Sequence, residues 1–375
     1  MRRWTILIGL GLALLPIHNE YLTQLLTREG QVLFFLPAIG WVLLAVGVGL
    51  FVLVNWKKIK EDWPDKQVWI PLAVIVGAIA LSGFVNGDTL SAKFSPLFMG
   101  LCMFGVFLVA RVLGEDIFKM LVPFVIVGSI SVIVLGILDR GQYTGGFITN
   151  YCASAGYLLF AVLVYEGGWK IPLMLLAGVG VFFIGALEAV FIIGVLGIVL
   201  LGRRDFDRKL ALVAGGLLIV IGVWGALGHL IPLYEGNNNL MVLRQIVTGK
   251  IALNGDTMTA LTTGRWPIIV DSVRNFSFIG HGFSLSTVGG GIVHNMPLII
   301  LWQVGPLAAL AWVFVSFRAL AKTGWKYIWV AVLAMGVFDH YLWTQMAPWW
   351  WALVGVTTVS NLRSDLIFRK VVATT

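Results

Sequence analysis

Long apolar runs separated by short polar segments form most of this chain. A helix that crosses a bilayer needs roughly 17 to 25 mostly apolar residues, and twelve runs approach or exceed that length. Because these runs are apolar on every face, the pattern predicts an all-α polytopic membrane protein with about twelve transmembrane helices. The expected spans are 4–17, 31–54, 68–86, 95–112, 118–138, 150–166, 171–186, 187–202, 210–232, 296–317, 326–342 and 346–361.

The division of residues 171–202 depends on one carboxylate. This run is too long for one helix and short for two. We place the boundary at Gly185-Ala186-Leu187-Glu188, because an ionised Glu188 in the middle of the bilayer would be costly. The choice fixes the helix count, and with it the side of the membrane on which every later loop lies.

One polar segment, from about residue 233 to 293, is much longer than the others and follows the expected ninth helix. Within it, Leu240–Gly249 and Trp266–Phe276 show the helical spacing of apolar residues. Long ordered loops usually carry function. The chain therefore divides into nine helices in residues 1–232, a helical cap loop in 233–293, and three helices with a C-terminal tail in 294–375.

Composition and charge indicate the compartment. With 59% hydrophobic residues, a mean hydropathy of +0.93 and 12% charged residues, most of the chain requires a bilayer as its solvent. The net charge of +8 lies in short clusters between apolar runs and forms no continuous stripe, which argues against nucleic-acid binding. With the N-terminus inside, 19 of the 26 basic residues fall in cytoplasmic segments. We therefore expect an inner-membrane protein with both termini in the cytoplasm and the long loop in the periplasm.

Two motifs in the second half of the long loop contain residues suited to chemistry. Thr263-Gly264-Arg265-Trp266 includes a cation, and His294-Asn295 stands at the exit of the loop, directly before an apolar helix. Each also has a structural interpretation, in which Arg265 is a solvated loop cation and His294 caps the helix. Between the two motifs, His281 is flanked by glycines in a turn, where we expect a structural role.

The order of these motifs resembles the superfamily of bacterial O-antigen ligases and O-antigen polymerases. Its members have many spans, a large periplasmic loop late in the chain, a Ser/Thr-Gly-Arg segment, a glycine-rich turn and a His-Asn pair at the start of the next helix. The matching segments are Thr263–Trp266, Phe278–Gly282 and His294-Asn295, with Gly305 following after nine residues. Gly145–Tyr151 and Phe338–Trp343 fit less specifically, and Leu187-Glu188 stands where members commonly carry Ser-Arg.

The resemblance implies transfer of a glycan from a polyprenyl (undecaprenyl) diphosphate donor to lipid A core oligosaccharide or to another lipid-linked glycan. The reaction would take place at the outer face of the inner membrane, among membrane lipids, and without metal or cofactor. Arg265, and second Arg140, would bind the diphosphate leaving group. His294 would be the general base for the acceptor hydroxyl. The supporting residues would be Gly264, Trp266, Asn295, Asp339, His340 and Glu188, the last as an alternative base.

Other classes of protein fit the same pattern. A transporter commonly has twelve spans, although ionisable residues are few within the apolar runs of this chain. A non-catalytic membrane partner, such as a phage-type immunity factor, would not need Arg265 and His294 together. Within the transferase class, the sequence does not separate ligase from polymerase or from protein glycosylation.

Three further features have structural interpretations. Glu188 is expected as a turn carboxylate at the membrane interface as well as an alternative base. Asp339-His340 either orients the site or marks the wet end of a span. Trp349-Trp350-Trp351 predicts an aromatic belt at the membrane interface more than a platform for sugars.

Overall fold

A computed structural model describes residues 3–16, 35–138, 151–165, 168–184, 245–246, 248–261, 265–283, 287, 290–291, 293–323, 325–338, 340–344 and 346–359. Every regular element in these ranges is a helix, and no strand occurs among them. The elements are α1 (Arg3–Leu14), α3 (Phe35–Glu61), α4 (Lys66–Asn86), α5 (Leu90–Leu113), the 3₁₀ helix η2 (Gly114–Leu121), α6 (Val122–Leu138), α7 (Tyr151–Val164), α8 (Lys170–Ile184), α12 (Gly255–Leu261), α13 (Arg265–Arg274), α14 (Met296–Val304), α15 (Pro306–Lys322), α16 (Lys326–Phe338) and α17 (Ala347–Thr357).

Three of these helices are long and apolar enough to cross a membrane. They cover Leu36–Glu61, Lys66–Asn86 and Leu90–Lys119, and correspond to the predicted spans 31–54, 68–86 and 95–112. The helical membrane class is therefore supported by the length and composition of these helices. The predicted spans 187–202 and 210–232 lie outside the described residues, so the count of twelve remains a prediction.

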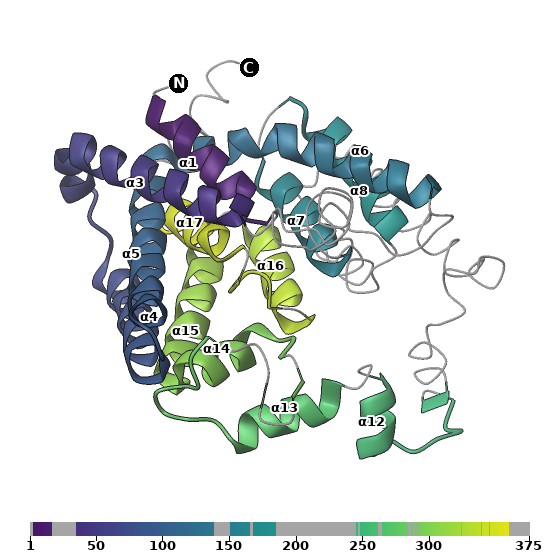
Figure 1. The fold of residues 1–375 in the computed structure, drawn as a ribbon. Coiled ribbons are helices and arrows are strands. Elements are labelled where there is room, and N and C mark those ends of the chain that lie inside the picture. Colours follow the sequence, from purple (N-terminus) through teal and green to yellow (C-terminus); the bar gives the residue numbers. More distant parts are fainter. Residues whose placement is uncertain are drawn as a thin grey trace.

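The helices α4, α5 and α15 form the frame on which the site is built. Asp65 caps α4 by accepting a hydrogen bond from the Gln67 backbone N–H, and Thr89 caps α5 in the same way through Ala92. α4 packs against both α5 and α15. Figure 1 shows these three helices running side by side, with α12 and α13 at the end of the frame far from α1.

The structure divides the predicted span 296–317 into two helices, α14 and α15. Gly305 separates the two helices with φ 91° and ψ 174°. The next residue is Pro306, which has no N–H to donate to the Trp302 carbonyl one turn earlier. The apolar run continues across this break, so hydrophobicity alone did not reveal it.

The aromatic belt predicted for Trp349, Trp350 and Trp351 is wrong. All three side chains are buried in the helix packing, with at most 1% of their surface exposed. The Trp349 indole donates to the Leu12 carbonyl at 3.2 Å, and the Trp350 indole donates to Ser316 Oγ at 3.3 Å. These residues therefore fasten α17 to α1 and α15 instead of facing lipid headgroups.

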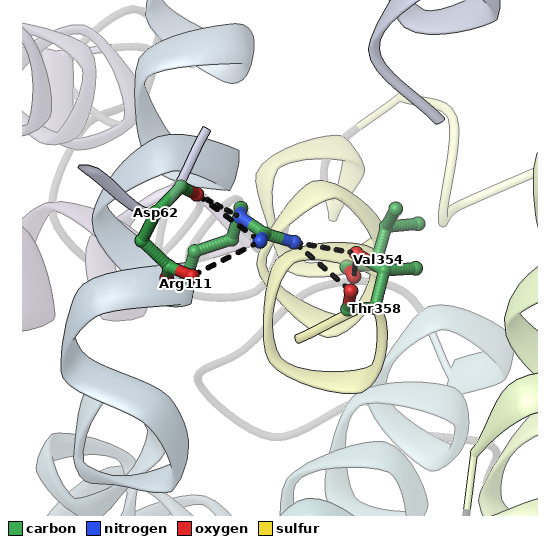
Figure 2. A network of polar contacts seen from close by, with 4 residues as sticks. All are labelled: Asp62, Arg111, Val354 and Thr358. Carbon is green, nitrogen blue, oxygen red and sulfur yellow. Dashed lines mark hydrogen bonds and ion pairs between the residues drawn. The ribbon is translucent and has the colours of Figure 1, made fainter. Parts of the chain in front are cut away.

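A buried arginine joins three segments at one end of the frame. The Arg111 guanidinium on α5 donates to the Asp62 carbonyl at 3.1 and 3.2 Å and approaches the Asp62 carboxylate at 3.4 Å. Its other nitrogen donates to the Thr358 carbonyl at 3.0 Å. Figure 2 shows the guanidinium lying between the residue that follows α3 and the residue that follows α17. One side chain thus satisfies backbone groups that neither helix satisfies internally.

A second charged cluster lies on the same turn between α3 and α4. Asp65 accepts from Arg318 at 2.7 Å and is 3.6 Å from Lys322, both near the end of α15. The hydrogen bond from the Gln67 backbone and then the Arg318 guanidinium hold the pKa of Asp65 below its ordinary value. The ends of α3, α5, α15 and α17 therefore lie at one end of the frame.

Removal of the Arg111 guanidinium should destabilise the helix packing strongly. Arg111→Met keeps an apolar stem but leaves the Asp62 and Thr358 oxygens without this donor, and we expect a loss of about 1–3 kcal/mol. The matched control is Lys119→Met, which removes an exposed ion pair with Asp116 and should cost less than about 1 kcal/mol. Thermal unfolding of detergent-purified protein measures both changes. Equal melting temperatures for the two variants would contradict the role of Arg111.

Candidate functional site

The cap loop contains two short helices in its described part. Asn254 and Thr257 start α12 through reciprocal hydrogen bonds, in which each side-chain oxygen accepts from the other's backbone N–H at 2.9 and 2.7 Å. α13 then runs from Arg265 to Arg274 and packs against α12 and α14. The predicted helical segment Trp266–Phe276 is thus confirmed over most of its length, whereas Leu240–Gly249 lies largely outside the described residues.

The turn that follows α13 is fastened to the break between α14 and α15. The His281 backbone N–H donates to the Trp302 carbonyl at 2.8 Å, the same carbonyl that Pro306 leaves without a helical donor. The His281 ring stacks on the Trp302 indole at 3.9 Å between centroids, and its Nε2 lies 2.7 Å from the Asn275 carbonyl oxygen. These contacts agree with the structural role expected for His281.

Two glycines allow the backbones to approach closely at this junction. A Cβ atom on Gly280, where φ is 80°, would lie 2.1 Å from the Gln303 carbonyl oxygen. A Cβ atom on Gly305 would lie 2.2 Å from the Phe278 carbonyl oxygen. Only glycine fits either position, which gives the glycine-rich turn a physical reason.

Gln303 connects this junction to α4 and to the turn before α17. Its buried backbone carbonyl accepts from Ser82 Oγ at 2.6 Å, and its side-chain Oε1 accepts from the Trp343 indole at 2.9 Å. Asn86 on α4 donates to the Gly280 carbonyl at 3.4 Å. Ser82, Asn86 and Gln303 were not identified from the sequence, and Trp343 was named only as the end of the segment Phe338–Trp343. A polar residue inside an apolar run, such as Gln303, is a signal that could have been used.

His294 lies beside a second imidazole. Its ring centroid is 5.1 Å from that of His340, with the ring planes at 68°, and His340 in turn lies 4.8 Å from the Tyr341 ring. His340 is buried, with 4% of its surface exposed, whereas His294 is half-buried and so in part accessible. The structure thus brings together two histidines that the sequence analysis had assigned separate roles.

Asn295 fixes the position of His294. Its Oδ1 accepts from the Leu298 N–H at 3.1 Å and its Nδ2 donates to the Val337 carbonyl on α16 at 3.0 Å. Asn295 is therefore the N-cap of α14, and the alternative in which His294 caps this helix is wrong. A single side chain ties the start of α14, and the adjacent His294, to the helix that leads to His340.

Arg265 is the first residue of α13 and is half-buried. One turn later, Ile268 contacts Gly291, where a Cβ atom would lie 2.4 Å from the isoleucine side chain. Gly291 precedes His294 by three residues, so α13 packs on the segment that leads into the histidine. Trp266 follows Arg265 and is also half-buried. Gly264, Arg140, Glu188 and Asp339 lie outside the described residues, and their predicted roles remain predictions.

The described residues offer a cation, two imidazoles and a polar cap loop at one end of the helix frame. An imidazole can accept a proton near neutral pH, and a guanidinium can stabilise an anionic oxygen. Among the described residues, no group of three or more His, Cys, Asp or Glu side chains gathers as a metal site would require. The arrangement is suited to proton transfer beside a polar ligand.

The fold and the site define the protein as a helical membrane protein with a polar cap over one end of its helix frame. Comparison with protein-family models found no matching family, and comparison with curated proteins found no matching relative.

The close contact at Gly280 provides a direct test of the junction. Gly280→Ala and Gly290→Ala both place alanine at φ 80°, but Gly290 has open space around it. Both variants should lose about 1–2 kcal/mol through the left-handed backbone. Gly280→Ala should lose about 1–3 kcal/mol more, because the turn must leave the Trp302 and Gln303 carbonyls. Thermal unfolding in detergent measures the difference, and equal destabilisation would refute the contact.

Proposed function

We propose that this protein transfers a glycan from a polyprenyl diphosphate donor to an acceptor glycan at the outer face of a bacterial inner membrane. The observation that carries the proposal is the pairing of His294 with His340 at the entry to α14, in the same cap as Arg265. A solvated loop cation and a helix-capping histidine would not require this arrangement. Since Asn295 caps α14, His294 is not needed as the cap of this helix.

Arg265 is assigned to the leaving group. During transfer the bond between the anomeric carbon and the diphosphate oxygen breaks, and negative charge develops on the diphosphate. A guanidinium binds two oxygens at once and stabilises this charge without a metal ion. A second cation would strengthen the binding, and Arg140 is the candidate for that position.

His294 is assigned to the acceptor. A new bond forms between the acceptor oxygen and the anomeric carbon, and the hydroxyl proton moves to the imidazole of His294. The buried His340 restricts the orientation of this ring and keeps water from one side of it. The acceptor is either lipid A core oligosaccharide or another lipid-linked glycan.

The proposal requires the cap loop to face the periplasm. Leu253 is 64% exposed beside α12, whereas Lys60 is exposed at the opposite end of the frame. In a background without Cys102 and Cys152, Leu253→Cys should react with an impermeant maleimide in intact spheroplasts, and Lys60→Cys only after lysis. The reverse labelling would place the cap in the cytoplasm and exclude a lipid-linked donor in the outer leaflet.

Substitutions at Arg265 and His294 should separate donor binding from transfer. Arg265→Lys keeps the charge but loses the planar two-point contact with phosphate, so it should be nearly as damaging as Arg265→Ala. His294→Ala should reduce transfer by about 10²–10⁴-fold while leaving donor binding intact, because a base acts on the acceptor. Lys250→Ala, an exposed cation of the same loop, is the matched control and should retain activity.

Two measurements on detergent-purified protein distinguish the steps. Binding of a labelled undecaprenyl-diphosphate glycan reports the donor, and a mobility shift of the glycan product reports transfer. Normal transfer by both alanine variants would refute the assignments and favour the transporter alternative. Loss of donor binding in both would place the two residues in one phosphate site and require a different base.

A further inference from the structure

A hollow between α12 and α13 lies beside the candidate site. It has a volume of about 430 Å³, within the range of roughly 300–1,000 Å³ that small-molecule sites occupy. One wall comes from α12 and the other from successive turns of α13. The lining residues are Gly255, Asp256, Thr259, Trp266, Pro267, Val270, Asp271, Arg274 and Asn275.

The hollow is lined by an apolar surface on one part and by polar and charged side chains on another. Trp266, Pro267 and Val270 provide an apolar surface along α13, and the tryptophan is half-buried, so part of the residue is accessible. An indole face favours contact with weakly polar C–H groups. An entirely hydrated ligand such as a free ion would not use this surface.

Two polar side chains of the hollow are joined by a hydrogen bond. Asn275 donates to the Asp271 carboxylate at 2.5 Å, which holds both side chains in place at the end of α13. Asp256 on α12 and Arg274 on α13 also line the hollow, and a guanidinium offers a fork of donors. A ligand with several neighbouring hydroxyls can donate to the carboxylates and accept from the guanidinium at the same time.

The charge of the lining excludes a phosphate as the preferred ligand. Asp256 and Asp271 are anionic and Arg274 is the single cation among the lining residues, so the hollow carries a net negative charge. A diphosphate would be repelled, whereas an uncharged ligand would not. The hollow therefore differs in its chemistry from the leaving-group position assigned to Arg265.

We propose that this hollow binds an uncharged saccharide, with the Trp266 indole against the C–H face of one sugar ring and Asp256, Asp271 and Arg274 on its hydroxyls. Trp266 directly follows Arg265, so the saccharide lies next to the residue assigned to the donor. Its identification as the acceptor glycan rests on the proposed transfer reaction. Saccharide binding itself does not depend on that reaction.

The binding test uses the full-length protein in detergent and needs no turnover. Saturation-transfer NMR with neutral di- and trisaccharides of glucose, galactose and heptose should show contact with the wild-type protein. Trp266→Ala should weaken binding by about 3- to 10-fold, the range expected for loss of one aromatic contact. Trp63→Ala is the matched control, because Trp63 is 42% exposed on the turn at the opposite end of the frame, and it should bind as the wild type does.

Thermal unfolding of both variants establishes that each is folded before binding is compared. Absence of saccharide binding by the wild-type protein, or equal binding by wild type and a folded Trp266→Ala, overturns the proposal. Competition by inorganic pyrophosphate at the Trp266-dependent site also overturns it, since the hollow would then prefer an anion. A second variant, Asp256→Asn, should weaken binding less than Trp266→Ala because the amide still bonds to hydroxyls.

Transfer assays separate this proposal from the proposed function. In an active protein, Trp266→Ala should raise the acceptor KM by a similar factor and leave the KM of the donor unchanged. Trp266-dependent saccharide binding by a protein that transfers no glycan would support saccharide binding in the hollow and refute the transfer reaction. Glycan transfer without Trp266-dependent saccharide binding would refute saccharide binding in the hollow but not the transfer reaction.

Discussion

The proline at position 306 determines how the cap loop is attached to the helices. Pro306 cannot donate to the Trp302 carbonyl, and a backbone oxygen left unsatisfied away from water is costly. The His281 N–H supplies the missing hydrogen bond at 2.8 Å, and the adjacent Gln303 carbonyl receives the Ser82 hydroxyl at 2.6 Å. The turn after α13 is therefore hydrogen-bonded to the helices, and these bonds connect the cap loop of the candidate site to the helix frame.

At both ends of the frame, backbone oxygens near helix ends need hydrogen-bond donors, and the two ends supply them differently. At one end, the Arg111 guanidinium satisfies oxygens that follow α3 and α17. At the other end, glycine backbones and the Gln303 side chain connect α4, α14 and the turn that contains Trp343. Between the two junctions the helices pack through apolar side chains and a few buried indole hydrogen bonds, such as Trp350 to Ser316 Oγ at 3.3 Å.

The sequence predicted the features of single segments well, but it did not predict which distant residues contact each other. Apolar runs identified α3, α4 and α5 because length and hydrophobicity are properties of a segment. The break at Gly305 was missed because the run stays apolar across it, and the position of Trp349–Trp351 was wrong because packing overrides the interfacial preference of tryptophan. Ser82 and Gln303 meet across 221 residues of chain, and no local pattern specifies such a contact. The sequence analysis named Arg265, His294 and His340, but the contact between the two imidazoles, at 5.1 Å between ring centroids, required the fold.

The two ligands of the proposed reaction need opposite electrostatic surroundings, and α13 can supply both. A diphosphate requires cations and few carboxylates, whereas a hydroxyl acceptor benefits from carboxylates that accept its hydrogen bonds. Arg265 and Trp266 are successive residues at the start of this helix, where neighbouring side chains point in different directions. Asp271 and Arg274 continue the Trp266 side toward the far end of α13. A short helix can thus hold a charged and an uncharged ligand at adjacent positions without bringing the phosphate against the acidic groups.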